Sequence, residues 1–414
     1  MVEEKFIFTG GAKKKIIITA IVGLVLMIVG ILTFGSGGHG AVEGNIADHV
    51  VHWSKRLWIN IWINNVFFTG LAIIGFFFVA LQYVAQAGWH VVIQRIPEAF
   101  GSWLPIAGGL MIATFLIANH DIFHWTHDYL YDKNDPRYDA IIDGKKGFLN
   151  YGFFLARMVV YFVVWYLFYR AVRKESLAED INGGLTHYRK MVKFSAIFIV
   201  FFGITSSTSA WDWVMSIDTH WFSTMFGWYL FSSWFVAGLA AIALVVILLK
   251  EAGYLKAVNS SHIHNLGLYV FAFSVFWTYI WFSQFLLIYY ANIPEESIYF
   301  VERWHSETYS TYFYLNVILN FVFPFLVLMT RDSKRQMIIL KIVCVVVLIG
   351  HWLDVYLMVS PGPLAKDGGI GFMEIGVTLL YMAAFVFTVL TSLSKASLIP
   401  KKHPMLEESV HHHI

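Results

Sequence analysis

Histidine and carboxylate side chains lie within or beside long apolar segments of this 414-residue sequence. His351 and Asp354 are three residues apart, and His120 and His124 are four apart. Each pair shares one face if its segment is helical. A face that carries both a carboxylate and an imidazole can accept and pass on protons, because histidine titrates near neutrality. The spacing therefore predicts a proton-transfer site.

Charged groups in hydrocarbon cost at least about 2.5 kcal/mol each, so they face the interior of a helix bundle. From their positions along the apolar segments, nearly all of them are expected toward one side of the membrane. The candidates for proton transfer or quinone binding are His120, Asp121, His124, Arg157, Gln284, Glu307, His351, Asp354 and Glu374. We expect most of them to converge on one cavity in the outer half of the membrane. Arg157 has a structural alternative, an ion pair with Glu374 or Asp354.

The apolar segments themselves predict the fold class. A membrane-spanning helix needs about 20 mostly apolar residues, and open sheet edges are excluded from lipid. Hydrophobic residues make up 58% of the chain and charged residues 14%, so an all-α polytopic membrane protein is expected. Ten transmembrane helices are predicted, over residues 16–34, 62–84, 103–120, 148–168, 191–209, 221–249, 266–291, 312–330, 337–360 and 372–393.

The distribution of basic residues predicts the orientation. With the N-terminus in the cytoplasm, 20 of the 29 Lys and Arg residues lie in cytoplasmic segments and eight in outer ones. The positive-inside rule therefore places both termini in the cytoplasm. The net charge of +2 and the lack of a basic domain argue against nucleic acid as a partner.

Two parts of the sequence resemble each other at an offset of 168 residues. His52-Trp53 and Gly70-Leu71-Ala72 recur as His220-Trp221 and Gly238-Leu239-Ala240. An even number of spans separates the copies, which predicts a parallel repeat about an axis along the membrane normal. The expected domains are an N-terminal segment with the first span (1–61), two four-helix bundles (62–210 and 211–360), and a last span with its tail (361–414).

The sequence offers little for a resident redox group. Cys344 is the only cysteine, so no thiolate cluster and no C-x-x-C-H haem attachment are expected, and no cofactor is bound covalently. Axial haem ligation by His120 or His124 with His351 is disfavoured, because the outer halves lack a second pair. No metal site is assigned, either to these residues or to His411–His413, which are expected to form a disordered tail.

With these features, the chain resembles the NrfD-like, or polysulfide-reductase, family of membrane subunits. Segments 120–127 (HDIFHWTH) and 211–216 (WDWVMS) carry the resemblance. It is most similar to the second, ActF-type, NrfD-like subunit of bacterial alternative complex III, a quinol:electron-acceptor oxidoreductase. This resemblance implies a bacterial cytoplasmic membrane, a quinone such as menaquinone near the outer face, and bound lipids. The implied partners are an iron–sulfur protein, c-type haem proteins and a second NrfD-like subunit, so the chain is not expected to be catalytic alone.

The sequence is also compatible with two other functions. Buried charges and a parallel repeat also suit a secondary transporter, although such proteins usually place the site on broken helices at the midplane. Among the predicted spans, Pro324 in the eighth is the exception to otherwise uninterrupted helices. A scaffold subunit without a quinone site is the third reading.

Overall fold

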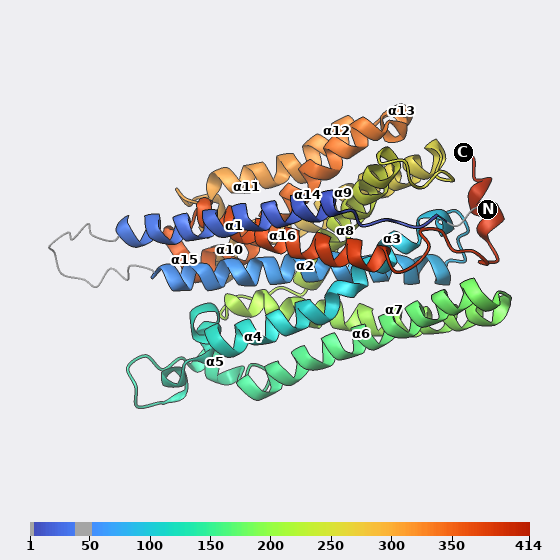
Figure 1. The fold of residues 1–414 in the computed structure, drawn as a ribbon. Helices are drawn as coiled ribbons and strands as arrows, with labels where there is room; N and C mark the ends of the chain where they lie inside the picture. Colours follow the sequence, from blue (N-terminus) through green and yellow to red (C-terminus); the bar gives the residue numbers. More distant parts are fainter. Residues whose placement is uncertain (1–3, 38–51) are drawn as a thin grey trace.

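The structure, a computed structural model, describes residues 4–37 and 52–414. Its long helices run roughly along one direction (Figure 1). Ten helices in this part of the chain are long and apolar enough to cross a membrane, and the described residues form no β-strand. The prediction of an all-α polytopic membrane protein with ten spans is confirmed.

Eight of the spans are single helices and two are interrupted. The third consists of α3 and α4, joined by a 3-10 turn, and the eighth consists of α11 and α12, joined by a π-helical turn at Ile318–Val322. The helices that form the spans are α1 (Gly10–Gly37), α2 (Trp53–Val84), α3 (Arg95–Phe100), α4 (Leu104–Ile122), α6 (Tyr151–Asn182), α7 (Leu185–Trp213), α8 (Phe226–Glu251), α9 (Ser260–Ala291), α11 (Ser310–Val317), α12 (Phe323–Val327), α14 (Met337–Val359) and α16 (Phe372–Leu393). Short helices connect them: α5 (Ala140–Gly144), α10 (Pro294–Trp304), α13 (Arg331–Arg335), α15 (Pro361–Leu364) and, in the tail, α17 (Leu406–Val410).

Both ends of the chain lie at the same end of the bundle, which we call the N/C end (Figure 1). The amide of Leu398 donates to the carbonyl of Glu4 at 2.8 Å, and Lys5 and Ser397 form an isolated antiparallel bridge. An even number of spans returns the chain to its starting side. The other end, with α5, α10 and α15, is called the opposite end.

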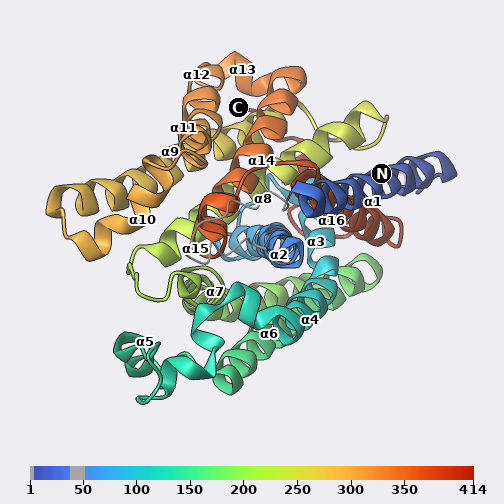
Figure 2. The same cartoon turned by 90° about the vertical axis from the view of Figure 1, so that its left-hand side faces the viewer.

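Helix α2 lies at the centre of the bundle, as the end-on view in Figure 2 shows. It packs against α3, α4, α7, α8, α14 and α16. Helix α1 packs mainly along α16 and exposes Ile17, Ile21 and Val25, which suits a helix in contact with lipid. Helices α4 and α7 adjoin α2, α6 packs against α4 and α7, and α9 and α14 adjoin α8. The parallel repeat and the domain bounds stay predictions, because they require a superposition of the two sets of helices.

Two glycines allow α2 and α8 to approach closely. A methyl group at Gly70 would lie 2.2 Å from Cδ1 of Trp234, and one at Gly238 would lie 2.2 Å from Cγ2 of Ile74. These are the glycines of the two Gly-Leu-Ala motifs in the repeat. Small residues at such crossings let membrane helices gain van der Waals contact.

Replacing Gly238 with alanine should therefore destabilise the protein by about 1–3 kcal/mol, the usual cost of overpacking a dense core. The free energy of unfolding in mixed micelles measures this. Gly203→Ala on α7 is the matched control, because an added methyl there meets no atom within 4 Å. Equal stabilities of the two variants would show that the α2–α8 contact tolerates a wider spacing.

Candidate functional site

A fully buried carboxylate, Asp354, lies in the span formed by α14. The hydroxyl of Tyr229 and the amide of Asn316 donate to its Oδ1, the latter at 2.9 Å. The indole of Trp277 donates to Oδ2 at 2.9 Å. Four helices, α8, α9, α11 and α14, thus meet at one carboxylate. With His351 and Ser233, these residues are called the Asp354 cluster.

His351 is the member of the Asp354 cluster that keeps a free ring nitrogen. Its Nδ1 lies 3.1 Å from the hydroxyl oxygen of Ser233 and 3.9 Å from Oδ2 of Asp354. Its Nε2 is buried and has no hydrogen-bond partner among the described residues. The ring of Trp277 stands nearly perpendicular to the imidazole at 5.5 Å. His351 and Asp354 thus lie on one face of α14, as their spacing predicts, and Nε2 is the ring nitrogen without a partner among the described residues.

The eighth span supplies residues that the sequence reading overlooked. Asn316 ends the regular part of α11, and Asn320 lies in the π-helical turn that follows and donates to Oδ1 of Asn316 at 2.6 Å. π-helical turns inside α-helices occur often at functional sites. The sequence pattern that could have indicated them is a pair of asparagines four residues apart in an apolar segment. Side chains at this spacing share one face of a helix.

Glu374 lies elsewhere, at the start of α16, and is also fully buried. Nε of Arg56 donates to its Oε1 at 2.7 Å, the amide of Asn60 donates to the same oxygen at 2.8 Å, and the backbone N–H of Gly371 donates to Oε2 at 2.8 Å. Arg56 and Glu374 border an open cavity of about 240 Å³ that is also lined by Thr33 of α1. This cavity combines a charge pair with access from the helix surface.

A line of amides on α2 runs from Glu374 toward the helix of His351. Asn60 and Asn64 follow Arg56 at intervals of four residues, so they share one face of α2. The side-chain amide of Asn64 donates to the carbonyl of Asn60 at 2.9 Å, and Trp352 on α14 donates to Oδ1 of Asn64 at 3.2 Å. Glu374 and α14 are thereby connected through α2.

Arg157 binds a carboxylate that the sequence reading did not consider. Its Nε and Nη2 donate to the two oxygens of Asp212 on α7, each at 2.8 Å, and Tyr161 donates to Oδ2 at 3.1 Å. The prediction that Arg157 pairs with Glu374 or Asp354 is wrong. The bidentate geometry uses both oxygens of a carboxylate that is itself 1% exposed, so this pair joins α6 to α7.

The histidines after α4 lie at the surface of the opposite end. His120 and His124 are exposed, and Asp121 is partly exposed. The rings of His120 and His124 both lie near that of His127, at 5.0 and 5.7 Å. Partial burial, followed by the nearby His127, lowers the pKa of His124. No three His, Cys, Asp or Glu side chains among the described residues are arranged to hold a metal ion.

The expected convergence on one cavity is therefore wrong. The structure distributes the predicted residues over four places: the histidine surface, the Arg157–Asp212 pair, the Glu374 cavity and the Asp354 cluster. Gln284 is buried on α9 with neither amide atom hydrogen-bonded among the described residues, and Glu307 is exposed. Residues of similar depth sit on different sides of the central helix α2, which keeps them apart.

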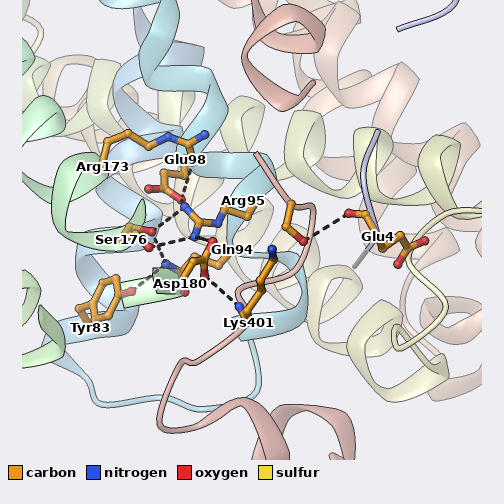
Figure 3. A network of polar contacts seen from close by, with 10 residues as sticks. Glu4, Tyr83, Gln94, Arg95, Glu98, Arg173, Ser176, Asp180 and Lys401 are labelled. Atoms are coloured by element: carbon orange, nitrogen blue, oxygen red, sulfur yellow. Dashed lines mark hydrogen bonds and ion pairs between the residues drawn. The ribbon is translucent and has the colours of Figure 1, made fainter. Parts of the chain in front are cut away.

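A second polar network lies at the N/C end (Figure 3). Arg95 contacts Oε2 of Glu98 at 3.3 Å and Oδ2 of Asp180 at 2.7 Å, and it donates to the hydroxyl of Ser176 at 2.9 Å. Arg173 binds the same oxygen of Glu98 at 2.9 Å. Arg95 and Glu98 are each 1% exposed. The expectation that ionisable groups gather on one side of the membrane is therefore wrong, because both ends carry buried charges.

The C-terminal tail covers this network. The hydroxyl of Ser409 donates to the carbonyl of Trp89 at 2.7 Å, and Nε2 of His412 lies 3.0 Å from the side-chain nitrogen of Asn265. The expectation of a disordered tail at His411–His413 is wrong. His403, within the tail, and His90, beneath it, are both buried, and neither Nε2 has a partner among the described residues. Burial, with Arg95 as the second cause, lowers the pKa of His403 to about 4.

Acidification from pH 7.5 to 5.5 should consequently loosen the tail about tenfold. Undocked His403 takes up a proton below its ordinary pKa of 6.5, whereas the docked side chain does so only near 4. Docking is thus fully stable above pH 6.5 and loses stability as the pH falls toward 4. One pH unit below 6.5 corresponds to about a factor of ten for one histidine. Hydrogen exchange of residues 403–410 measures the opening, and His403→Gln should reduce the pH dependence by the factor of about ten that this histidine contributes. Exchange that is independent of pH in the wild type would contradict this account.

With ten helices able to span a membrane, the described part of this chain is a polytopic membrane protein. Its helix bundle contains buried ionisable groups, among them Asp354, Glu374 and Arg95. Its sequence matches no protein-family model and no curated protein. The geometry of the Asp354 cluster and of the Glu374 cavity is therefore the basis for assigning a function.

Proposed function

We propose that this chain is an integral membrane subunit of a quinol-oxidising respiratory complex, similar to the NrfD-like subunits of alternative complex III. In this proposal it lies in the bacterial cytoplasmic membrane with the N/C end in the cytoplasm. It contributes a quinol-binding and proton-transfer site in the outer half. Its partners are a second NrfD-like subunit, an iron–sulfur protein and c-type haem proteins. The electrons pass to the iron–sulfur protein and then to the haem proteins.

The observation that carries the proposal is the buried His351–Asp354 pair with its free Nε2. Quinol oxidation releases two protons as two electrons depart, so the protein must supply groups that accept them. Asp354 already accepts three hydrogen bonds, which hold its carboxylate group in place beside His351. It therefore acts through His351: it orients the ring and stabilises the imidazolium that forms when Nε2 takes a proton.

The Glu374 cavity suits the headgroup of a lipid-soluble quinol. It opens at the surface between α1, α2 and α16, and the ion pair of Arg56 and Glu374 forms the polar part of its wall. A quinone ring needs such partners for its two oxygens, and an apolar ring can enter from lipid. In this division of roles, Glu374 and Arg56 bind the ring and the Asp354 cluster handles protons.

Purification in mild detergent tests the proposal directly. The tagged chain is expected to copurify with c-type haem absorbance and iron–sulfur proteins, and the complex should reduce an electron acceptor with a menaquinol analogue. Glu374→Gln should mainly raise the KM for quinol if Glu374 helps to bind the ring. A chain that purifies alone, without haem or quinol turnover, would contradict the proposal.

A secondary transporter is the second candidate, because the π-helical turn of the eighth span interrupts its helix beside Asp354. Interrupted spans are common at transporter sites. Solute uptake by proteoliposomes that contain the chain alone would favour this function over the first, since the respiratory proposal requires partner proteins.

A further inference from the structure

A cavity of about 400 Å³ lies near the N/C end on the outer surface of the bundle. The second half of α6, the end of α16 and the turn between α3 and α4 form its walls. Three cations line it, Arg170, Arg173 and Lys395, and none of the residues that line it is acidic. Positive charge is thus concentrated at one place where helices leave the apolar region.

The three cations differ in what already neutralises them. Arg173 binds Glu98 at 2.9 Å, within the network of Figure 3. Arg170 and Lys395 are exposed, and neither forms an ion pair among the described residues. The one hydrogen bond of the Arg170 guanidinium in this region goes to the neutral hydroxyl of Tyr166, at 3.4 Å. Two uncompensated cations therefore face the cavity.

The remaining walls are of two kinds. Hydroxyl groups of Ser102, Thr388, Thr391 and Ser392 lie along one part, and Leu177 and Phe387 supply exposed apolar surface. Lys395 follows the last residue of α16, Leu393, by two positions, so the cations lie at the boundary between the apolar span and the polar end. An anionic group with an attached hydrocarbon chain matches this combination of charge and depth.

We propose that this cavity binds the phosphate headgroup of an anionic phospholipid, such as phosphatidylglycerol, with the acyl chains along Phe387 and α6. Basic pockets between transmembrane helices are suited to such headgroups. Arg170 and Lys395 bind the phosphate from two helices, and the lipid thereby joins α6 to α16. The lipid is preferred to free phosphate because the cavity opens beside apolar surface at the membrane boundary. This inference is independent of the proposed respiratory function.

Native mass spectrometry of the detergent-solubilised protein tests the proposal. The protein is titrated with phosphatidylglycerol, with zwitterionic phosphatidylcholine and with inorganic phosphate. Each cation near a membrane surface contributes about 1 kcal/mol to anionic-lipid binding, so Arg170→Gln/Lys395→Gln should weaken the tightest phosphatidylglycerol site roughly thirtyfold. Each single substitution should weaken it roughly fivefold, which keeps the test valid if the double variant does not fold.

Lys174→Gln/Lys193→Gln is the matched control, because both lysines are exposed near the same end and do not line the cavity. Its phosphatidylglycerol affinity should stay at the wild-type value, and Arg170→Lys/Lys395→Arg should retain most binding. Equal losses in the test and control variants would overturn the proposal, as would equal binding of phosphatidylcholine. Displacement of the lipid by millimolar inorganic phosphate would identify a soluble-anion site and would also overturn it.

Discussion

Replacing Asp354 with asparagine should lower quinol-driven turnover of the assembled complex by at least about tenfold. The substitution keeps the side-chain volume and removes the charge that stabilises protonated His351. It also introduces an amide group beside the indole N–H of Trp277, which donates to Asp354 at 2.9 Å. The orientation of the His351 ring, which packs against Trp277, is thereby disturbed. A loss of about 1.4 kcal/mol of transition-state stabilisation corresponds to a tenfold lower rate, which sets the lower bound. Turnover and proton release at the outer face are the measurements.

Asp128→Asn provides the control for this substitution, because Asp128 is an exposed carboxylate in the loop after α4. Its turnover should equal that of the wild type. Assembly of both variants is checked by haem content and partner recovery. If the Asp354 variant assembles and both rates are unchanged, the cluster has a structural role and the scaffold reading is favoured.

Replacing Arg157 with leucine should destabilise the protein by about 3–5 kcal/mol. Among the described residues, the change leaves Tyr161 as the one side chain that donates to the buried carboxylate of Asp212. Removing one partner of a buried pair typically has this cost, because the remaining charge is uncompensated. The free energy of unfolding in mixed micelles measures the effect.

A second substitution identifies the partner of Arg157. Arg157→Leu/Asp212→Leu should recover more than half of the lost stability, since replacing both charges by apolar groups is often neutral. Arg157→Leu/Glu374→Gln should recover none, because Glu374 binds Arg56 instead. Rescue by the Glu374 change and not by the Asp212 change would contradict the ion pairs described above.

The fold class and the ten spans were predictable because each span carries its own evidence. An apolar run of about 20 residues must form a helix in lipid whatever its neighbours are. In the eighth span, Pro324 indicated that the helix is interrupted. The local pairing of His351 with Asp354 was likewise predictable, since residues three apart on a helix share a face.

The partners of the buried charges depended on which helices adjoin. Arg157 and Asp212 are 55 residues apart, and Arg56 and Glu374 are 318 apart, so no local pattern connects them. Depth along the membrane could be inferred from helix direction, but the position of each helix around α2 could not. This is why residues of similar depth were wrongly assigned to one cavity.

The partners of Arg95 at the N/C end were also not predictable from the sequence. Arg95 read as one of many basic residues that face the cytoplasm, yet Ser176, Asp180 and the C-terminal tail enclose it. By itself the sequence determined the membrane class, the number of spans and the near-neighbour pair in α14. The tertiary structure alone decided which charges neutralise one another, because burial of an ion requires a specific partner, and packing of distant helices supplies it.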